Sequence, residues 1–195
     1  SRSRSAQIIS DARRRYRRHN PARKYVENEL YAELALSGRG EIAASEVRER
    51  LRRDPAIREA LEWMWPTLSP AEFLHDLYGA RGLLRNAAGT LLSEAEWQSL
   101  YRERSESIGE IDWTHDDAPL LDEARSLLGP KPRRRRQGEA NDDDEIRTYG
   151  HIVVDEAQDL SPMQLRMLER RSLNGSMTVV GDIAQATGQW AHESW

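Results

Sequence analysis

Two acidic residues directly follow a short apolar run late in the sequence. The run His151-Ile152-Val153-Val154 is rich in β-branched residues and is typical of a buried parallel strand, and Asp155 and Glu156 come next. Ligands bind at the carboxyl edge of open parallel sheets, so a carboxylate at Asp155 could hold the Mg²⁺ that bridges nucleotide phosphates. Glu156 points to a different side and could orient and deprotonate an attacking water. Acids at a strand end are a weak signal alone, since carboxylates also cap chain segments.

A second strand and a glutamine follow at a fixed distance. Met177-Thr178-Val179-Val180 predicts the strand, which runs into Gly181-Asp182-Ile183-Ala184-Gln185. Between the two strands, Ser161-Pro162-Met163-Gln164 has the pattern of a capping box at the start of a helix. The segment therefore predicts a βαβ unit with parallel strands. We expect the Gln185 amide to lie beside the acid pair, where it could sense a γ-phosphate.

The two sequences at these strand ends resemble motifs II and III of superfamily 1 helicases of the UvrD/Rep type. They are Val-Val-Asp-Glu-Ala-Gln-Asp and Val-Val-Gly-Asp-x-x-Gln. The resemblance implies an ATPase that uses ATP and Mg²⁺, with Asp155 as the metal ligand and Glu156 as the catalytic base. It also implies that Gln158 links the nucleotide to the nucleic-acid track, and that Gln185 contacts the γ-phosphate and relays its state. Asp159 and Asp182 could simply cap the segments that follow them.

The sequence over roughly residues 55–195 is similar, more narrowly, to actinobacterial HelD/HelR proteins. The similar segments are Met64-Trp65-Pro66-x-Leu68, Leu74-His75-Asp76-Leu77-Tyr78-Gly79, Trp113-Thr114, Pro119-Leu120-Leu121-Asp122-Glu123-Ala124 and Ser176 through Gln185. Those relatives are helicase-like ATPases that bind RNA polymerase and free it from stalled or inhibited complexes. The resemblance implies RNA polymerase core as a partner, with DNA as a further candidate.

Most of the chain before these motifs is predicted to be helical. Pro21 is expected to break the chain before a helix over residues 22–36, and Gly38 is expected to end that helix. Later helices are expected to begin at Ser45, Pro55, Ser69, Ser93 and Pro119. We predict a helical subdomain over residues 1–129, a charged linker over 130–146 and a partial RecA-like βαβ unit over 147–195. The expected fold class is α/β with a large helical part, in which a mainly helical subdomain precedes a partial RecA-like P-loop NTPase parallel sheet.

Charge is distributed unevenly along the chain. Its net charge is −4, but residues 1–24 hold nine Lys/Arg and only Asp11 as an acid, about +8, so residues 25–195 carry about −12. This basic arm could bind nucleic acid or an acidic protein surface, or could be a solvated helix face. Arg133 to Arg136 in the linker could bind phosphate, although a flexible insert is the favoured interpretation.

Composition excludes several classes of protein. There is no cysteine, which rules out disulfides and thiolate metal sites. No apolar run approaches the roughly 20 residues that span a bilayer. A cytoplasmic protein with no membrane partner is expected.

The sequence also departs from a complete ATPase. It contains no G-x-x-x-x-G-K-[ST] phosphate loop, whose backbone N–H groups and lysine cradle phosphates. Nor does it contain the second RecA-like domain that the resemblance calls for. We therefore expect a piece of a longer protein that does not hydrolyse ATP alone. Three interpretations stay open: part of a polymerase-recycling ATPase, part of a DNA-unwinding UvrD-like helicase, or a non-catalytic module that binds RNA polymerase or nucleic acid.

Overall fold

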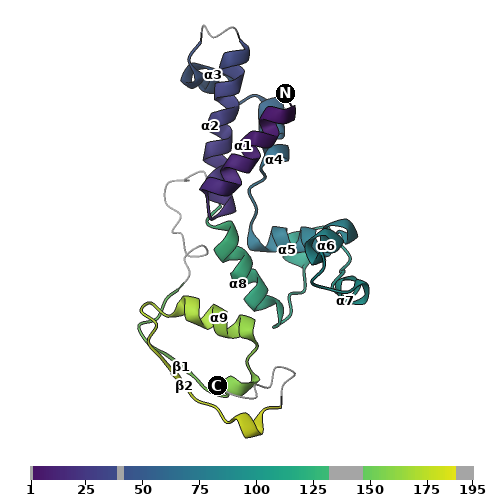
Figure 1. Cartoon of the computed structure of the whole chain (residues 1–195), viewed down its shortest axis with the longest axis vertical. Coiled ribbons are helices and arrows are strands. Elements are labelled where there is room, and N and C mark those ends of the chain that lie inside the picture. Colours follow the sequence, from purple (N-terminus) through teal and green to yellow (C-terminus); the bar gives the residue numbers. More distant parts are fainter. Residues whose placement is uncertain (1, 39–41, 132–146, 188–195) are drawn as a thin grey trace. The chain divides into compact units, whose positions relative to one another are not determined.

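The computed structural model describes residues 2–38, 42–131 and 147–187 (Figure 1). The chain divides into two compact units. The first unit comprises Ser1–Ile111 and Ala124–Arg134, and the second comprises Asp112–Glu123 and Arg135–Trp195. The linker predicted over 130–146 lies almost wholly outside the described residues. Within the described ranges, every helix is too short or too polar to cross a membrane.

The first unit is built from helices joined by short connections. They are α1 (Arg2–Arg15), α2 (His19–Ser37), α3 (Ala44–Leu51), α4 (Pro55–Met64), α5 (Pro70–Tyr78), α6 (Arg81–Ala88), α7 (Glu94–Ser99), a 3₁₀ turn η1 (Ile108–Glu110) and the end of α8 (Asp117–Leu128). The predicted mainly helical character of this region is confirmed.

Local sequence signals set most of the helix starts. The side chain of Asp54 accepts hydrogen bonds from the first turn of α4, where Pro55 needs no N–H partner. The capping boxes predicted at Ser69 and Ser93 are both present, each with a glutamate that returns a bond to the cap backbone.

Three predicted helix starts are wrong. Helix α8 begins at Asp117 rather than Pro119, which lies in its first turn. Helix α2 begins at His19 rather than Ala22, and Pro21 lies in its first turn, where the missing N–H leaves no bond unmade. Helix α3 begins at Ala44 after Ala43 at the cap position, with no side-chain cap bond. Ser45 therefore lies inside this helix and does not cap it.

Helices α1, α2 and α4 share the main hydrophobic core of the first unit. Its buried members come in pairs from each helix: Ile8 and Ala12, Ala22 and Val26, and Leu61 with Trp65, the residue that follows α4. Arg23 on α2 closes the carboxyl end of α4, where its guanidinium donates to the carbonyls of Leu61, at 2.6 Å, and Trp65. Cations and donors at a helix C-terminus satisfy carbonyls that have no partner within the helix.

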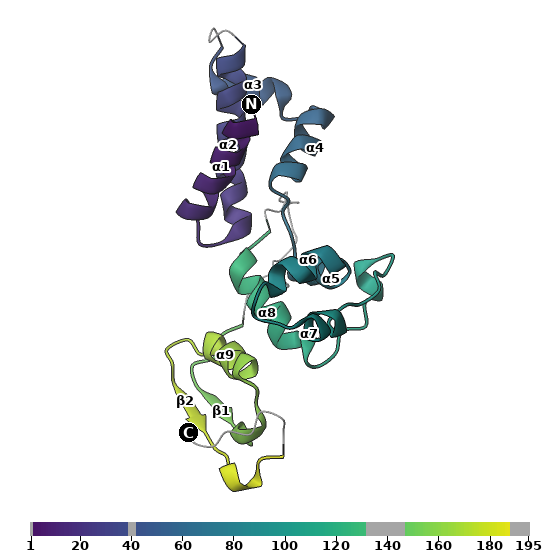
Figure 2. The same cartoon turned by 45° about the vertical axis from the view of Figure 1, so that its right-hand side comes forward.

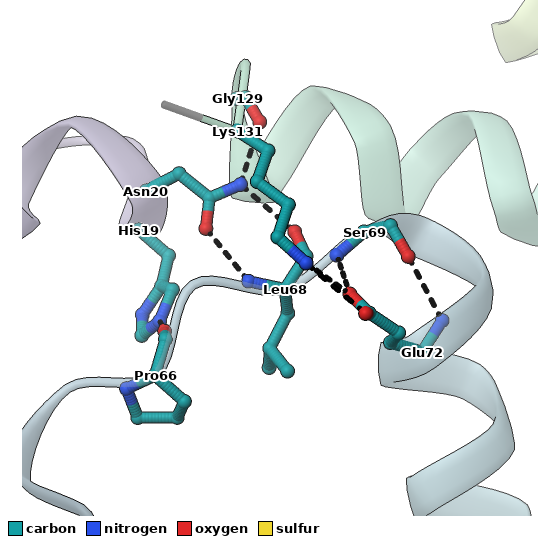
Figure 3. A network of polar contacts seen from close by, with 8 residues as sticks. All are labelled: His19, Asn20, Pro66, Leu68, Ser69, Glu72, Gly129 and Lys131. Carbon is teal, nitrogen blue, oxygen red and sulfur yellow. Dashed lines mark hydrogen bonds and ion pairs between the residues drawn. The ribbon is translucent and has the colours of Figure 1, made fainter. Parts of the chain in front are cut away.

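A buried amide at the start of α2 joins three segments of the first unit (Figure 3). The Asn20 side chain is 1% exposed. Its Nδ2 donates to the carbonyl oxygens of Leu68 and Gly129, at 2.9 and 2.8 Å, and its Oδ1 accepts from the Leu68 N–H at 3.0 Å. Next to it, the His19 ring stacks on Trp65 with 4.7 Å between centroids, and its Nε2 lies 2.7 Å from the Pro66 carbonyl oxygen.

An ion pair adds to this junction at the first turn of α5. Lys131 Nζ lies 2.8 and 3.0 Å from the two carboxylate oxygens of Glu72, the same glutamate that completes the Ser69 capping box. Burial alone would raise the pKa of Glu72, but the bonds from Lys131 and Ser69 outweigh it and hold that pKa below its usual value.

The second unit contains the βαβ order predicted from the sequence. Strand β1 (Ile152–Val154) is followed by a 3₁₀ turn η2 (Ala157–Asp159), helix α9 (Pro162–Arg171), strand β2 (Met177–Val179) and a 3₁₀ turn η3 (Ile183–Gln185). The strands are parallel and side by side (Figure 2), with Val153 opposite Thr178, and the capping box at Ser161 is present. A small parallel sheet next to helices is compatible with part of a P-loop NTPase-like α/β fold.

The prediction of a buried strand is only partly right. Val154 is buried, but Val153 is 68% exposed and Val180, just after β2, is 51% exposed. Side chains alternate between the two faces of a strand, so one face of β1 is covered and the other is open. A continuous run of β-branched residues is typical of strands covered on both faces, and within the described residues this two-stranded sheet lacks the second cover.

Replacing Asn20 by Ala should destabilise the first unit by about 2–3 kcal/mol, because the backbone groups of Leu68 and Gly129 lose their partner. Urea unfolding followed by circular dichroism measures this loss. Asn28→Ala makes the same chemical change at an exposed position of the same helix and should cost nothing. Equal effects of the two substitutions would contradict the role given to Asn20.

Candidate functional site

The chain turns sharply where β1 ends. Glu156 has a left-handed backbone conformation, with φ 52° and ψ 40°, and is the one non-glycine residue with positive φ in the described parts of the chain. The turn lets the Ala157 N–H donate to the carbonyl of Val180 at 3.0 Å, and Asp155 Oδ1 accepts from the Glu156 N–H at 2.9 Å. Non-glycine residues adopt this conformation at a cost, and such residues gather at functional sites.

Gln158 connects the ends of the two strands. Its side chain is 1% exposed. Its Nε2 donates to Glu156 Oε2 at 2.6 Å, and its Oε1 accepts from the Asp182 N–H at 2.9 Å. A buried amide that satisfies both its ends is held in one orientation, so Gln158 fixes the Glu156 carboxylate relative to the end of β2.

Asp182 and Gln185 form the second half of the site. Asp182 Oδ1 accepts from the Ala184 N–H at 2.9 Å, so this residue caps η3. Its Oδ2 accepts from Gln185 Nε2 at 3.0 Å. Asp159 reaches across the same edge, where its Oδ1 accepts from the Thr187 N–H at 3.0 Å.

The four residues singled out in the sequence, Asp155, Glu156, Gln158 and Gln185, thus belong to one series of hydrogen bonds. It runs from Asp155 through the Glu156 backbone and carboxylate to Gln158, then through Asp182 to Gln185. Among the described residues, Gln185 makes no hydrogen bond to either acid directly. Gln158 and Asp182 provide the connection, and the sequence alone did not show that Asp182 takes part.

The possible metal ligands at this edge of the sheet fit a magnesium ion whose other ligands are water and phosphate oxygens. Asp155 is exposed, and one of its oxygens accepts the Glu156 N–H, which leaves Oδ2 without a hydrogen bond among the described residues. The described residues contain no group of three or more His, Cys, Asp or Glu that could enclose a metal. Mg²⁺ is commonly held by one or two carboxylates together with water and nucleotide phosphates, which agrees with such a sparse donor set.

A cluster of charged side chains positions the helix that follows the acid pair. The Asp122 carboxylate, 3% exposed, accepts from Arg170 Nε at 2.8 Å and from Arg171 Nη2 at 2.6 Å. Glu123 pairs with Arg170 Nη1 at 2.5 Å. These contacts join the middle of α8 to the end of α9. Sequence reasoning missed them because the partners lie 47–49 residues apart and no local pattern connects them.

Comparison with known proteins assigns the chain to a family. A family model described as an AAA domain matches residues 18–189. The chain belongs to the AAA domain family. The matched range includes both strand ends and most of the helical region, and is consistent with a UvrD/Rep-like superfamily 1 type of domain. AAA domains are P-loop NTPase-type domains, which generally use ATP and Mg²⁺. No curated protein sequence matches the chain.

Replacing Gln158 by Leu should destabilise the second unit of this AAA domain by about 1–3 kcal/mol, because the Asp182 N–H and the Glu156 carboxylate lose their partner. Hydrogen exchange at the amides of residues 152–158 and 177–185 reports the change. Gln185→Leu, the same substitution at an exposed glutamine with one surface bond, is the control and should change exchange little. Similar exchange rates in both variants would contradict the conclusion that Gln158 connects the ends of the two strands.

Proposed function

We propose that this chain supplies the metal-binding and catalytic carboxylates of a superfamily 1 helicase-like ATPase. The observation that carries the proposal is the series of hydrogen bonds from Asp155 through Glu156, Gln158 and Asp182 to Gln185 at one edge of the sheet. It joins the residues that the resemblance to motifs II and III assigns to the metal, the base and the γ-phosphate.

Each side chain has a role that its contacts permit. Asp155 would hold Mg²⁺ through the oxygen that makes no hydrogen bond among the described residues. Glu156 would accept the proton of the attacking water, while Gln158 holds its Oε2 in place. Gln185 is exposed, and its Nε2 could exchange the bond to Asp182 for one to a γ-phosphate oxygen. When bound, the metal ion would neutralise charge that develops on the phosphates.

Hydrolysis needs groups beyond these. The 195 residues contain no G-x-x-x-x-G-K-[ST] segment to cradle the β- and γ-phosphates. We infer that a phosphate loop from additional sequence completes the site, and that the chain alone is inactive.

We further propose that the complete ATPase acts on RNA polymerase core in the manner of HelD/HelR proteins. The support is the similarity of the segments around Trp65, Tyr78, Trp113 and Asp122, together with the sequence from Ser176 to Gln185. Motifs II and III are shared with DNA-unwinding UvrD-like helicases, which are therefore the competing assignment. The remaining competing assignment is a non-catalytic module that binds RNA polymerase or nucleic acid.

In a protein that combines this chain with a phosphate loop, Glu156→Gln should keep ATP binding and lower turnover about 10²–10⁴-fold, the usual contribution of a general base. Asp155→Ala should instead weaken Mg²⁺-dependent nucleotide binding. Steady-state phosphate release and nucleotide titration distinguish the two effects. Glu169→Gln, an exposed glutamate on α9, is the matched control. Normal turnover by Glu156→Gln would end the assignment of Glu156 as the base.

The polymerase assignment is tested by capture of RNA polymerase core on the same protein, with binding to single-stranded DNA measured in parallel at physiological salt. Tight capture is the expected result, with an affinity for the polymerase well above that for single-stranded DNA at physiological salt. Strong, salt-dependent DNA binding without capture would instead favour an ordinary DNA helicase.

A further inference from the structure

The corner between α1 and α2 exposes an unbroken run of cationic and aromatic side chains. Residues 13–18 read Arg-Arg-Arg-Tyr-Arg-Arg, and all six are exposed. Helix α1 ends at Arg15 and α2 begins at His19, so the run covers the last turn of one helix and the connection to the next. We refer to residues 13–18 as the basic corner.

Little of the positive charge at the basic corner is neutralised. Arg14 pairs with Asp11 at 2.6 Å, and Asp11 is the one acid among the first 24 residues. Among the described residues, Arg13, Arg17 and Arg18 take part in no ion pair.

Helix stability does not account for this arrangement. Arginines in the last turn of α1 interact favourably with the negative end of the helix dipole. Arg17 and Arg18, however, immediately precede the N-terminus of α2, where the dipole disfavours cations, and the first turn of α2 contains no acid. The corner concentrates charge at some cost to the fold, which points to a partner with negative charge.

Two tyrosines add flat aromatic surface to the corner. Tyr16 is 40% exposed, and its ring centroid lies 5.9 Å from that of Tyr25 at an interplanar angle of 42°. The Arg15 guanidinium lies over the Tyr25 ring, 5.1 Å from its centroid. Tyr16 thus lies at the surface among the arginines, with its ring against Tyr25.

We propose that the basic corner binds a single nucleic-acid strand, with Arg13, Arg14 and Arg17 on its phosphates and a base stacked on Tyr16. Cationic side chains interleaved with exposed aromatic rings are the combination that recognises unpaired strands, whose bases are free to stack. An acidic protein segment would use the arginines but not the ring, and a duplex would keep its bases out of reach of the ring. None of these residues belongs to the candidate ATPase site, so the inference does not depend on the proposed function.

The test measures fluorescence anisotropy of a labelled oligothymidine of about 16 nucleotides with the 195-residue chain at low salt. The triple variant Arg13→Gln, Arg14→Gln and Arg17→Gln should bind at least tenfold more weakly. For this variant, the slope of log K against log salt concentration should be smaller in magnitude by about 2, because each phosphate contact to a single strand contributes about 0.7 to that slope.

A matched triple variant removes the same charge elsewhere. Arg53, Arg58 and Arg85 are exposed arginines of the same unit, and replacing all three by Gln should leave affinity within twofold. Circular dichroism confirms that both variants keep their helices. Equal weakening by the two triple variants would show a general charge effect and overturn the proposal.

Tyr16→Leu separates stacking from charge. It should weaken binding of the single strand about tenfold, in line with the stacking of one base, and leave binding of a duplex of equal length unchanged. If Tyr16→Leu binds the single strand as tightly as the wild type does, a nucleobase does not stack on Tyr16 and that part of the proposal is wrong. Tight binding of a polyglutamate peptide, with none to the oligonucleotide, would assign the basic corner to an acidic protein instead.

Discussion

Backbone N–H and C=O groups that are buried away from water need another hydrogen-bond partner. In each of the two units, one buried side-chain amide provides such a partner where segments meet. In the first unit, Asn20 joins the start of α2 to the backbone before α5 and after α8. In the second, Gln158 satisfies the backbone at the end of β2 while it holds Glu156. An amide suits these positions because it carries donors and an acceptor together and needs no counter-charge.

The helices around Asn20 follow from that constraint together with apolar packing. Residues on α1, α2 and α4 form the core, while Arg23 and Trp65 use their polar groups on the backbone at the end of α4 and the start of α2. The polar groups thus define where each helix begins or ends against its neighbour. Apolar burial alone would allow the helices to slide, since it has no direction.

The parts predicted from sequence are those whose signals are local. A serine and a glutamate or glutamine three residues later fix the starts of α5, α7 and α9, and β-branched runs mark β1 and β2. Helix α2 begins earlier than predicted because Pro21 lies in its first turn, where a proline is tolerated. The partners of Asn20 lie 48 and 109 residues away, so no window of sequence contains them. In the candidate site the motifs single out the four residues, but the hydrogen bonds that connect them through Asp182 depend on the fold.

The left-handed backbone of Glu156 has a consequence for how this position tolerates change. Glycine adopts such a conformation without the steric penalty that every other L-residue meets, so glycine is the substitution with the least cost to the turn. Glycine has no carboxylate, however, and under the proposed role it would abolish the base. If Glu156 is the base, the backbone conformation and the chemistry favour different residues at this position. Under the proposed role, Glu156→Gly would therefore keep the turn and lose the base.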